Sequence, residues 1–291
     1  MSRIRIAIAV SIILTLQHLG ASPNAAAQQR AQLHFLAPGL STEVVSLLEN
    51  ELLPAFEAEY NVDVYVDPIA WGERSDRIAI LIASGNPPDV IGTGYYSPYQ
   101  EGGSRLLAPL DRYVAGWNDR SAIPEPVWET QTWRGSIVAV PLYFDLRAIA
   151  YNRNVFAESG LPRRSLHLNP VALGFINGLG ITELSRNKDF AWKFIEFFMS
   201  SEVLAKMQAV SGWMTTRVDL AEAPGAAHLT MYYPQVPYIK PAQLPPPRDR
   251  SQNELSQLMT RAINGEIAPE QAMLQAHELW ARLLEEWRSQ L

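Results

Sequence analysis

The chain has 291 residues and contains no cysteine. It therefore forms no disulfide framework and offers no thiol for a lipid anchor at an exported amino terminus. Neither a Gly-x-Ser-x-Gly elbow nor a phosphate loop is present. The five histidines are scattered without metal-ligand spacing, at His18, His34, His167, His228 and His277. We expect no cofactor, no metal site and no catalysis, although the plentiful carboxylates leave an acid pair for glycoside hydrolysis open.

Long apolar runs are also missing beyond the first residues. Residues 1–27 begin with Arg3 and Arg5, continue with an apolar run from Ile4 to Leu16, and end in three alanines. This pattern predicts a cleavable signal peptide with Gln28 as the first mature residue. The apolar run is too short for a comfortable membrane span. We expect a soluble periplasmic protein.

Acidic residues outnumber basic ones, 30 against 24, for a formal charge of −6. Loss of the signal removes two arginines and no acid, which leaves 22 basic residues and a charge of −8. This balance argues against a nucleic-acid partner. With 47% hydrophobic residues, the mature chain can fill the cores of two modest domains.

The mature chain opens with a predicted βαβ unit. Residues 32–36 and 62–66 alternate as strands, and residues 42–60 carry apolar side chains at helical spacing. Pro54 should kink or split this helix near Leu53. Because crossovers between strands of one sheet are right-handed, we expect the two strands to be parallel.

A second unit leads to the first candidate binding residues. A helix is predicted over 73–83 and a short strand over 89–92, separated by Pro87 and Pro88. The strand runs into Gly92-Thr93-Gly94-Tyr95-Tyr96. Ligands of open α/β sheets bind beyond the carboxyl ends of such strands. These tyrosines are therefore candidates for a ligand face, with an ordinary turn as the alternative.

Further elements are predicted along the second half of the chain. Residues 133–136 form a turn between two short strands, and a strand and a helix follow over 148–152 and 155–159. The helix over 185–199 should be capped by Asn187. Its phenylalanines form one core face, comprising Phe190, Phe194, Phe197 and Phe198. The last helix carries an apolar stripe of Met273, Ala276, Trp280, Leu283 and Trp287.

Several motifs resemble, in their order along the chain, the sugar-binding receptors of bacterial ABC importers. They are Gly85-Asn86-Pro87-Pro88-Asp89-Val90, Leu107-Ala108-Pro109-Leu110-Asp111, residues 133–161, residues 185–217, and residues 264–272. The resemblance covers nearly the whole mature chain. It implies an α/β fold of the class II periplasmic binding protein type, with two lobes around a ligand cleft.

The chain departs from this family after residue 162. Residues 163–166 pass almost directly to residues 174–181, which resemble the strand that returns to the first lobe. By comparison with the family, about a hundred residues, one domain's worth, are absent. We therefore predict an intact first lobe over 30–142 and 166–217, and a reduced second lobe over 143–165 and 218–291. The stripe of the last helix would then lose part of its cover.

Aromatic residues in predicted loops supply the candidate ligand contacts. Flat rings suit the apolar C–H faces of sugars, and polar neighbours suit their hydroxyls. The predicted ligand-binding residues are Trp71, Tyr95, Tyr96, Tyr143, Phe144, Asp145, Asn177 and Trp213. For Trp71, the alternative is a position in the core. The resemblance places residues 143–145 at the crossing between the lobes.

The resulting prediction is a periplasmic binding component of an ABC-type carbohydrate importer. Its partners would be a small sugar and permease subunits in the inner membrane. Receptors for a polyamine or a phosphorylated polyol, an exported hydrolase and a nonbinding remnant stay as alternatives. With a reduced second lobe, we expect weak binding.

Overall fold

The computed structural model describes residues 30–144, 172–223, 230–241 and 248–289. A six-stranded sheet in the order β2-β1-β3-β8-β6-β9 forms its centre. The strands are β1 (Ala31–Pro38), β2 (Val62–Ile69), β3 (Val90–Thr93), β6 (Val140–Phe144), β8 (Ile176–Ile181) and β9 (Met214–Thr215). Strands β2 and β3 run parallel to β1, whereas β8 is antiparallel to β3 and β6.

The predicted βαβ opening is confirmed. Strands β1 and β2 pair in parallel from Ala31 and Val62 onward. The intervening helix is divided into α2 (Thr42–Leu47), the π-helical segment η1 (Leu48–Leu52) and α3 (Leu53–Tyr60). Pro54 lies in the first turn of α3. Because proline has no N–H and its ring collides with the carbonyl of the preceding turn, regular helix cannot run through this point.

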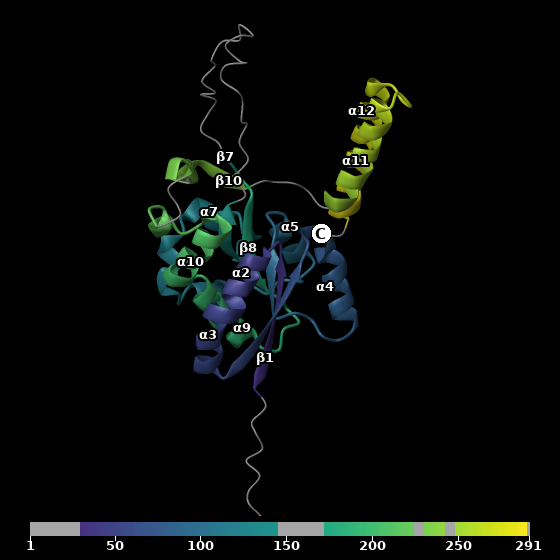
Figure 1. The fold of residues 1–291 in the computed structure, drawn as a ribbon. Coiled ribbons are helices and arrows are strands. Elements are labelled where there is room, and N and C mark those ends of the chain that lie inside the picture. The colour runs from purple at the N-terminus through teal and green to yellow at the C-terminus, as the bar shows by residue number, and fades with distance from the viewer. Residues whose placement is uncertain (1–29, 145–171, 224–229, 242–247, 290–291) are drawn as a thin grey trace, which may run out of the picture.

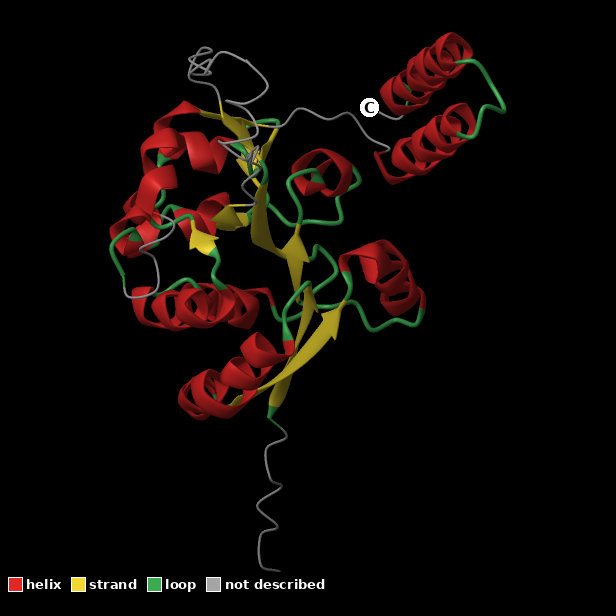
Figure 2. Cartoon of the chain, turned by 45° about the horizontal axis from the view of Figure 1, so that its top comes forward, coloured by secondary structure: helices red, strands yellow, loops and turns green. Residues whose placement is uncertain are grey.

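Both faces of the sheet are covered by helices (Figure 2). One face packs against α2, α3, α9 (Lys188–Phe198) and α10 (Ser201–Ser211), and the other against α4 (Arg74–Ala83). Side chains alternate across β1 accordingly, because successive residues of a strand point to opposite faces. Phe35 joins the larger apolar cluster, and Leu36 joins the smaller one with Ile78 of α4.

Short elements complete the body of the molecule. The hairpin of β4 (Thr132–Trp133) and β5 (Ser136–Ile137) confirms the predicted turn. Its two central residues, Arg134 and Gly135, both have positive φ, as a tight hairpin turn requires. The short helices are η2 (Trp71–Glu73), α5 (Ser97–Gly103), α6 (Asp111–Val114), η3 (Asn118–Ala122), α7 (Glu125–Glu129) and η4 (Val218–Leu220).

The buried face of α9 differs from the predicted one. Phe194 and Phe198 are fully buried, but Phe190 is exposed and Trp192 and Ile195 take its place. At 3.6 residues per turn, Phe190 lies about 100° around the helix from the centre of the buried stripe. Asn187 precedes the helix but does not cap it with its side chain. Instead, its Nδ2 donates to the carbonyl oxygen of Gln32 at 3.1 Å.

The last third of the chain has two parts. Segment η5 (Thr230–Tyr238) and β10 (Ile239–Pro241) stay with the body: β10 pairs in parallel with β7 (Ala172–Gly174), and the Tyr233 hydroxyl donates to the carbonyl oxygen of Thr215 at 3.2 Å. Helices α11 (Arg248–Ile263) and α12 (Pro269–Arg288) form a hairpin that stands away from the sheet (Figure 1). No helix among the described residues is long and apolar enough to span a membrane.

Candidate ligand-binding site

A hollow lies at the ends of the central strands, where the sequence predicts a site. It is a shallow, partly open hollow, and the space around it not filled by atoms, open solvent included, is about 270 Å³. Strand β1 contributes its last residue, Pro38; Trp71 follows β2; and Thr93 ends β3. The complete lining is Phe35, Ala37, Pro38, Leu40, Trp71, Gly92, Thr93, Leu142, Tyr143, Asn177, Gly178, Leu179, Phe198 and Trp213.

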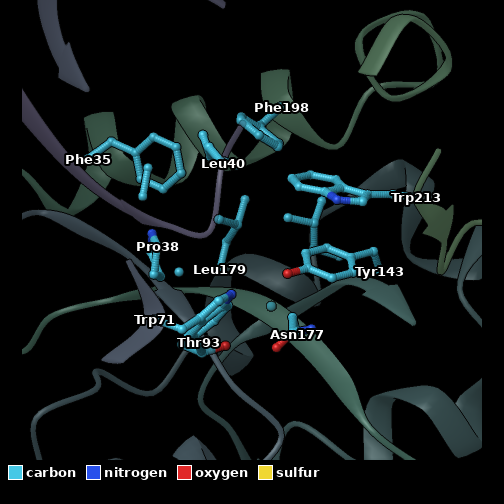
Figure 3. Close-up of a pocket in the computed structure, with 14 residues that line it drawn as sticks. Phe35, Pro38, Leu40, Trp71, Thr93, Tyr143, Asn177, Leu179, Phe198 and Trp213 are labelled. Carbon is cyan, nitrogen blue, oxygen red and sulfur yellow. The ribbon is translucent and has the colours of Figure 1, made fainter. Parts of the chain in front are cut away.

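Three half-buried aromatic side chains dominate the hollow. Figure 3 shows Trp71 on one side and the pair of Tyr143 and Trp213 on the other. The rings of this pair are stacked, with centroids 4.3 Å apart and planes inclined by 16°. Each of the three rings is partly exposed and lines the hollow. The arrangement presents aromatic surface from two directions to anything that enters.

Strand pairing brings Tyr143 and Trp213 together. Tyr143 pairs with Thr215 across β6 and β9, and Phe144 pairs with Met214. Trp213 directly precedes β9 and so reaches the ring of Tyr143. Residues 143 and 144 point to opposite faces, since side chains alternate along a strand. Phe144 is accordingly buried in the core, and Tyr143 lines the hollow.

Arg217 anchors the segment that carries Trp213. Its Nη1 donates to Oδ2 of Asp119 at 2.6 Å and to the carbonyl oxygen of Met199 at 2.9 Å, and its Nη2 donates to Oδ2 of Asp219 at 2.7 Å. Burial alone would lower the pKa of Arg217, but the bonds to Asp219 and Asp119 outweigh it and raise the pKa. The guanidinium therefore stays charged, and it ties β9 to η3 and to the end of α9.

Two polar side chains lie in the hollow between these rings. The amide of Asn177 lines the hollow and carries both hydrogen-bond donors and an acceptor. Thr93 Oγ1 lies 3.4 Å from Oε1 of the buried Gln131, whose Nε2 donates to the carbonyl oxygen of Ile176 at 3.0 Å. Gln131 was not predicted, because nothing in the sequence distinguishes it from any other loop glutamine.

The hollow is electrically neutral within the described part of the chain. None of its lining residues carries a charge. The buried side chains of Arg74 and Glu101 pair with each other, and Arg74 Nε also donates to the carbonyl oxygen of Gly92, a lining residue, at 2.7 Å. Across the described residues, no group of three or more histidine or acidic side chains could hold a metal ion. This lining suits an uncharged ligand.

The structure brings half of the predicted ligand contacts together. Trp71, Tyr143, Asn177 and Trp213 all line the hollow. Tyr95 and Tyr96 do not: Tyr95 is buried edge-on against Phe175, with centroids 4.7 Å apart, and it contacts Tyr96 in the same way. Phe144 points into the core, and Asp145 lies outside the described residues, as do the predicted elements over 148–152 and 155–159.

Part of this chain matches a known protein family. Residues 39–170 match the family of bacterial extracellular solute-binding proteins. The resemblance that the sequence motifs predict is thereby confirmed. The matched residues include Trp71, Thr93 and Tyr143 of the hollow.

Solved structures of solute-binding proteins share this fold. A solute-binding protein of an ABC transporter from Thermotoga lettingae, bound with α-D-tagatose, has a TM-score of 0.69 and 16% identity over 87% of this chain and 100% of its own. The sugar-binding protein MalE of Xanthomonas citri has a TM-score of 0.66 and 15% identity over 89% of this chain and 98% of its own. The GacH receptor of Streptomyces glaucescens has a TM-score of 0.69 and 15% identity over 89% of this chain and 99% of its own. The chain therefore has the α/β fold of periplasmic binding proteins.

Proposed function

We propose that this solute-binding protein binds a neutral carbohydrate and delivers it to an ABC-type importer. The observation that carries the proposal is the neutral hollow with Trp71 on one side and the stacked Tyr143 and Trp213 on the other. Rings of this kind cover the C–H faces of a sugar. We expect the amide of Asn177, which lines the hollow, to form hydrogen bonds with hydroxyl groups of the sugar.

The size of these contacts sets the expected affinity. Covering about 50 Å² of ring and sugar face is worth about 1 kcal/mol at ~25 cal/mol/Å². Two such contacts and two hydrogen bonds of about 1 kcal/mol each give roughly 4 kcal/mol, which corresponds to a dissociation constant near 1 mM. We expect this wall alone to bind a sugar weakly, with tighter binding only where further residues close over the ligand.

The electrical neutrality of the hollow disfavours the other solutes considered. A polyamine needs carboxylates, and a phosphorylated polyol needs arginine or backbone N–H groups that neutralise phosphate. The described lining supplies no charged side chain of either sign. A glycoside hydrolase would need a pair of carboxyl groups beside the sugar, and the described lining has none.

The cellular setting that we propose rests on the sequence. Cleavage of residues 1–27 would release the protein into the periplasm, where permease subunits of the inner membrane would receive the sugar. The surplus of acidic residues suits a soluble carrier and disfavours a nucleic-acid partner. We propose no cofactor and no catalytic step for this cycle.

A thermal-shift panel tests the proposal. Tagatose, glucose, maltose and maltotriose at 10 mM should each be compared with spermidine and with glucose 6-phosphate. We expect at least one neutral sugar to raise the melting temperature and both charged ligands to fail. The Trp71→Ala variant should lose most of the shift. A response to spermidine or to the phosphate ester, with none to the neutral sugars, would overturn the proposal.

A further inference from the structure

The ring of Trp71 occupies the space where residue 39 would carry a side chain. A methyl group built on Gly39 would lie 2.2 Å from Nε1 of Trp71 and 2.6 Å from Cδ1. Both distances are far below van der Waals contact. Gly39 directly follows β1, and Trp71 begins the short helix η2 after β2; the N–H of Gly39 donates to the carbonyl oxygen of Ile69 at 2.8 Å. The ring thus rests directly on the backbone of the neighbouring loop.

We propose that Gly39 is a positioning residue for Trp71 and so determines the geometry of the ligand-binding wall. This inference rests on the proposed function, since Trp71 is taken as a ligand contact. Gly39 itself does not line the hollow. Its role is to leave open the volume into which the indole settles. Any side chain at position 39 displaces the indole from its observed position.

A turn requirement alone does not explain Gly39. Its φ of +74° is readily adopted by glycine and rarely by other residues. Gly85 has φ +77° and Gly212 has φ +69°, but an added methyl group at either position would meet nothing within 4 Å. At these two positions the backbone conformation, and not a steric contact, disfavours a side chain. Gly39 meets the same backbone demand and, in addition, the contact with the indole.

The backbone that carries Trp71 is fixed, so a displaced ring cannot take its helix along. The N–H of Glu73 donates to the carbonyl oxygen of Ala70 at 3.1 Å and closes the turn that contains Trp71. Arg74 begins α4 and is held by Glu101 and by the carbonyl oxygen of Gly92 at 2.7 Å. Pressure from residue 39 therefore turns the indole about its own side-chain bonds and changes the wall of the hollow.

The test compares Gly39→Ala with Gly85→Ala, which introduces the same backbone strain at a site with open space. Sugar affinity is measured by calorimetry for both, alone and combined with Trp71→Ala. We expect Gly39→Ala to weaken binding about fivefold, as expected from losing one ring contact, and Gly85→Ala to leave affinity unchanged. In the Trp71→Ala background, Gly39→Ala should have no further effect. Equal affinity of Gly39→Ala and the unmodified protein would overturn the inference, and so would a full loss that persists without the indole.

A ligand-independent measurement separates this inference from the proposed function. Subtracting the spectrum of the matching Trp71→Phe protein isolates the fluorescence of Trp71, and acrylamide quenching reports its exposure. We expect quenching of Trp71 to change in Gly39→Ala and to stay unchanged in Gly85→Ala. If no sugar binds the unmodified protein but this change is seen, the positioning role stands and the proposed ligand fails. Unchanged quenching in Gly39→Ala would overturn the positioning role whatever the ligand.

Discussion

The sheet body and the carboxyl-terminal hairpin both use amphipathic helices, but they bury the apolar faces of these helices to different extents. In the body, α9 buries Phe194 and Phe198 completely against β1 and α3. In the hairpin, Ile263 of α11 is 80% exposed and Met273 of α12 is 72% exposed. The periodic pattern identifies which face of a helix is apolar. It does not determine whether another element covers that face.

Within the hairpin, one part of the apolar stripe of α12 is buried and another part is exposed to solvent. Among the described side chains of α12, Ala272, Leu279 and Leu283 are buried, while Met273 faces solvent. The sequence predicts a single stripe that runs through Met273 and Leu283 and loses part of its cover; in the structure Leu283 is covered, whereas Met273 is exposed. Helix α11 covers part of the stripe. The remaining exposed surface gathers near the connection between the helices, at Met259, Ile263, Met273 and Leu274.

The largest difference in stability should appear between the truncation of a buried apolar residue in the body and that of an exposed one in the hairpin. Phe194→Ala removes a fully buried ring and should lower the free energy of unfolding by about 3–5 kcal/mol. Met273→Ala removes an exposed side chain and should change it by less than about 0.5 kcal/mol. Denaturant unfolding followed by circular dichroism measures both. Similar losses in the two variants would mean that the hairpin surface is covered in solution.

A second contrast concerns ion pairs. Arg74→Met leaves the buried Glu101 without its partner and should cost about 3 kcal/mol. Arg282→Met removes an exposed contact to Glu254 at 3.7 Å and should cost less than about 1 kcal/mol. Unfolding at low and high salt distinguishes the two, because screening weakens only the exposed pair. If Arg74→Met proves as mild as Arg282→Met, the buried pair does not hold α4 and α5 in place.

A smaller effect, dependent on pH, is expected at Tyr233. Burial raises the pKa of its phenol, so the folded protein keeps the proton at pH values where the unfolded chain loses it. Stability from this group is complete below pH ~10 and is lost as the pH rises further. Tyr233→Phe should cost about 1 kcal/mol at pH 7 through the lost bond to Thr215, and should flatten the decline above pH 10. The exposed Tyr238→Phe is the control, and an equally flattened profile there would contradict this assignment.

The smallest effect on stability should come from the hairpin surface itself. Exchange of Ile263 and Met273 for glutamine should leave the free energy of unfolding within about 0.5 kcal/mol. The same exchange should reduce the fluorescence of a dye that binds apolar surface, because both apolar side chains are exposed. Glutamine in place of the exposed Phe190 of α9 serves as a control on the body. Dye fluorescence that falls only in the Phe190 variant would place the binding surface on the body.

The sequence predicts local features of the body well. Strands 32–36 and 62–66, the break at Pro54 and the turn at Arg134 and Gly135 follow from periodicity and backbone chemistry. Pairings between segments that are distant in the sequence are harder to predict from it. The antiparallel placement of β8 between β3 and β6, and the approach of Trp213 to Tyr143, depend on tertiary contacts that leave no local signal.

The same distinction between local features and tertiary contacts holds for the predicted site residues. Trp71, Tyr143, Asn177 and Trp213 stand at strand ends or crossings, and the structure brings them together. Burial of Tyr95 against Phe175 depends on packing across the fold. The inward direction of Phe144 follows from strand alternation once Tyr143 is assigned to the hollow. Gly39 could have been noticed as a glycine directly after a strand, but only the folded arrangement reveals the indole against it.

Calorimetric titration of a neutral sugar into the unmodified protein, Trp71→Ala and Tyr143→Ala tests the central claim most directly. The account predicts measurable binding to the unmodified protein and a loss of fivefold or more in each variant, because each removes a ring contact worth about 1 kcal/mol. The unfolding transitions of the three proteins should confirm that all are folded. Unchanged affinity in both variants would contradict the account, because it would place the sugar outside the hollow.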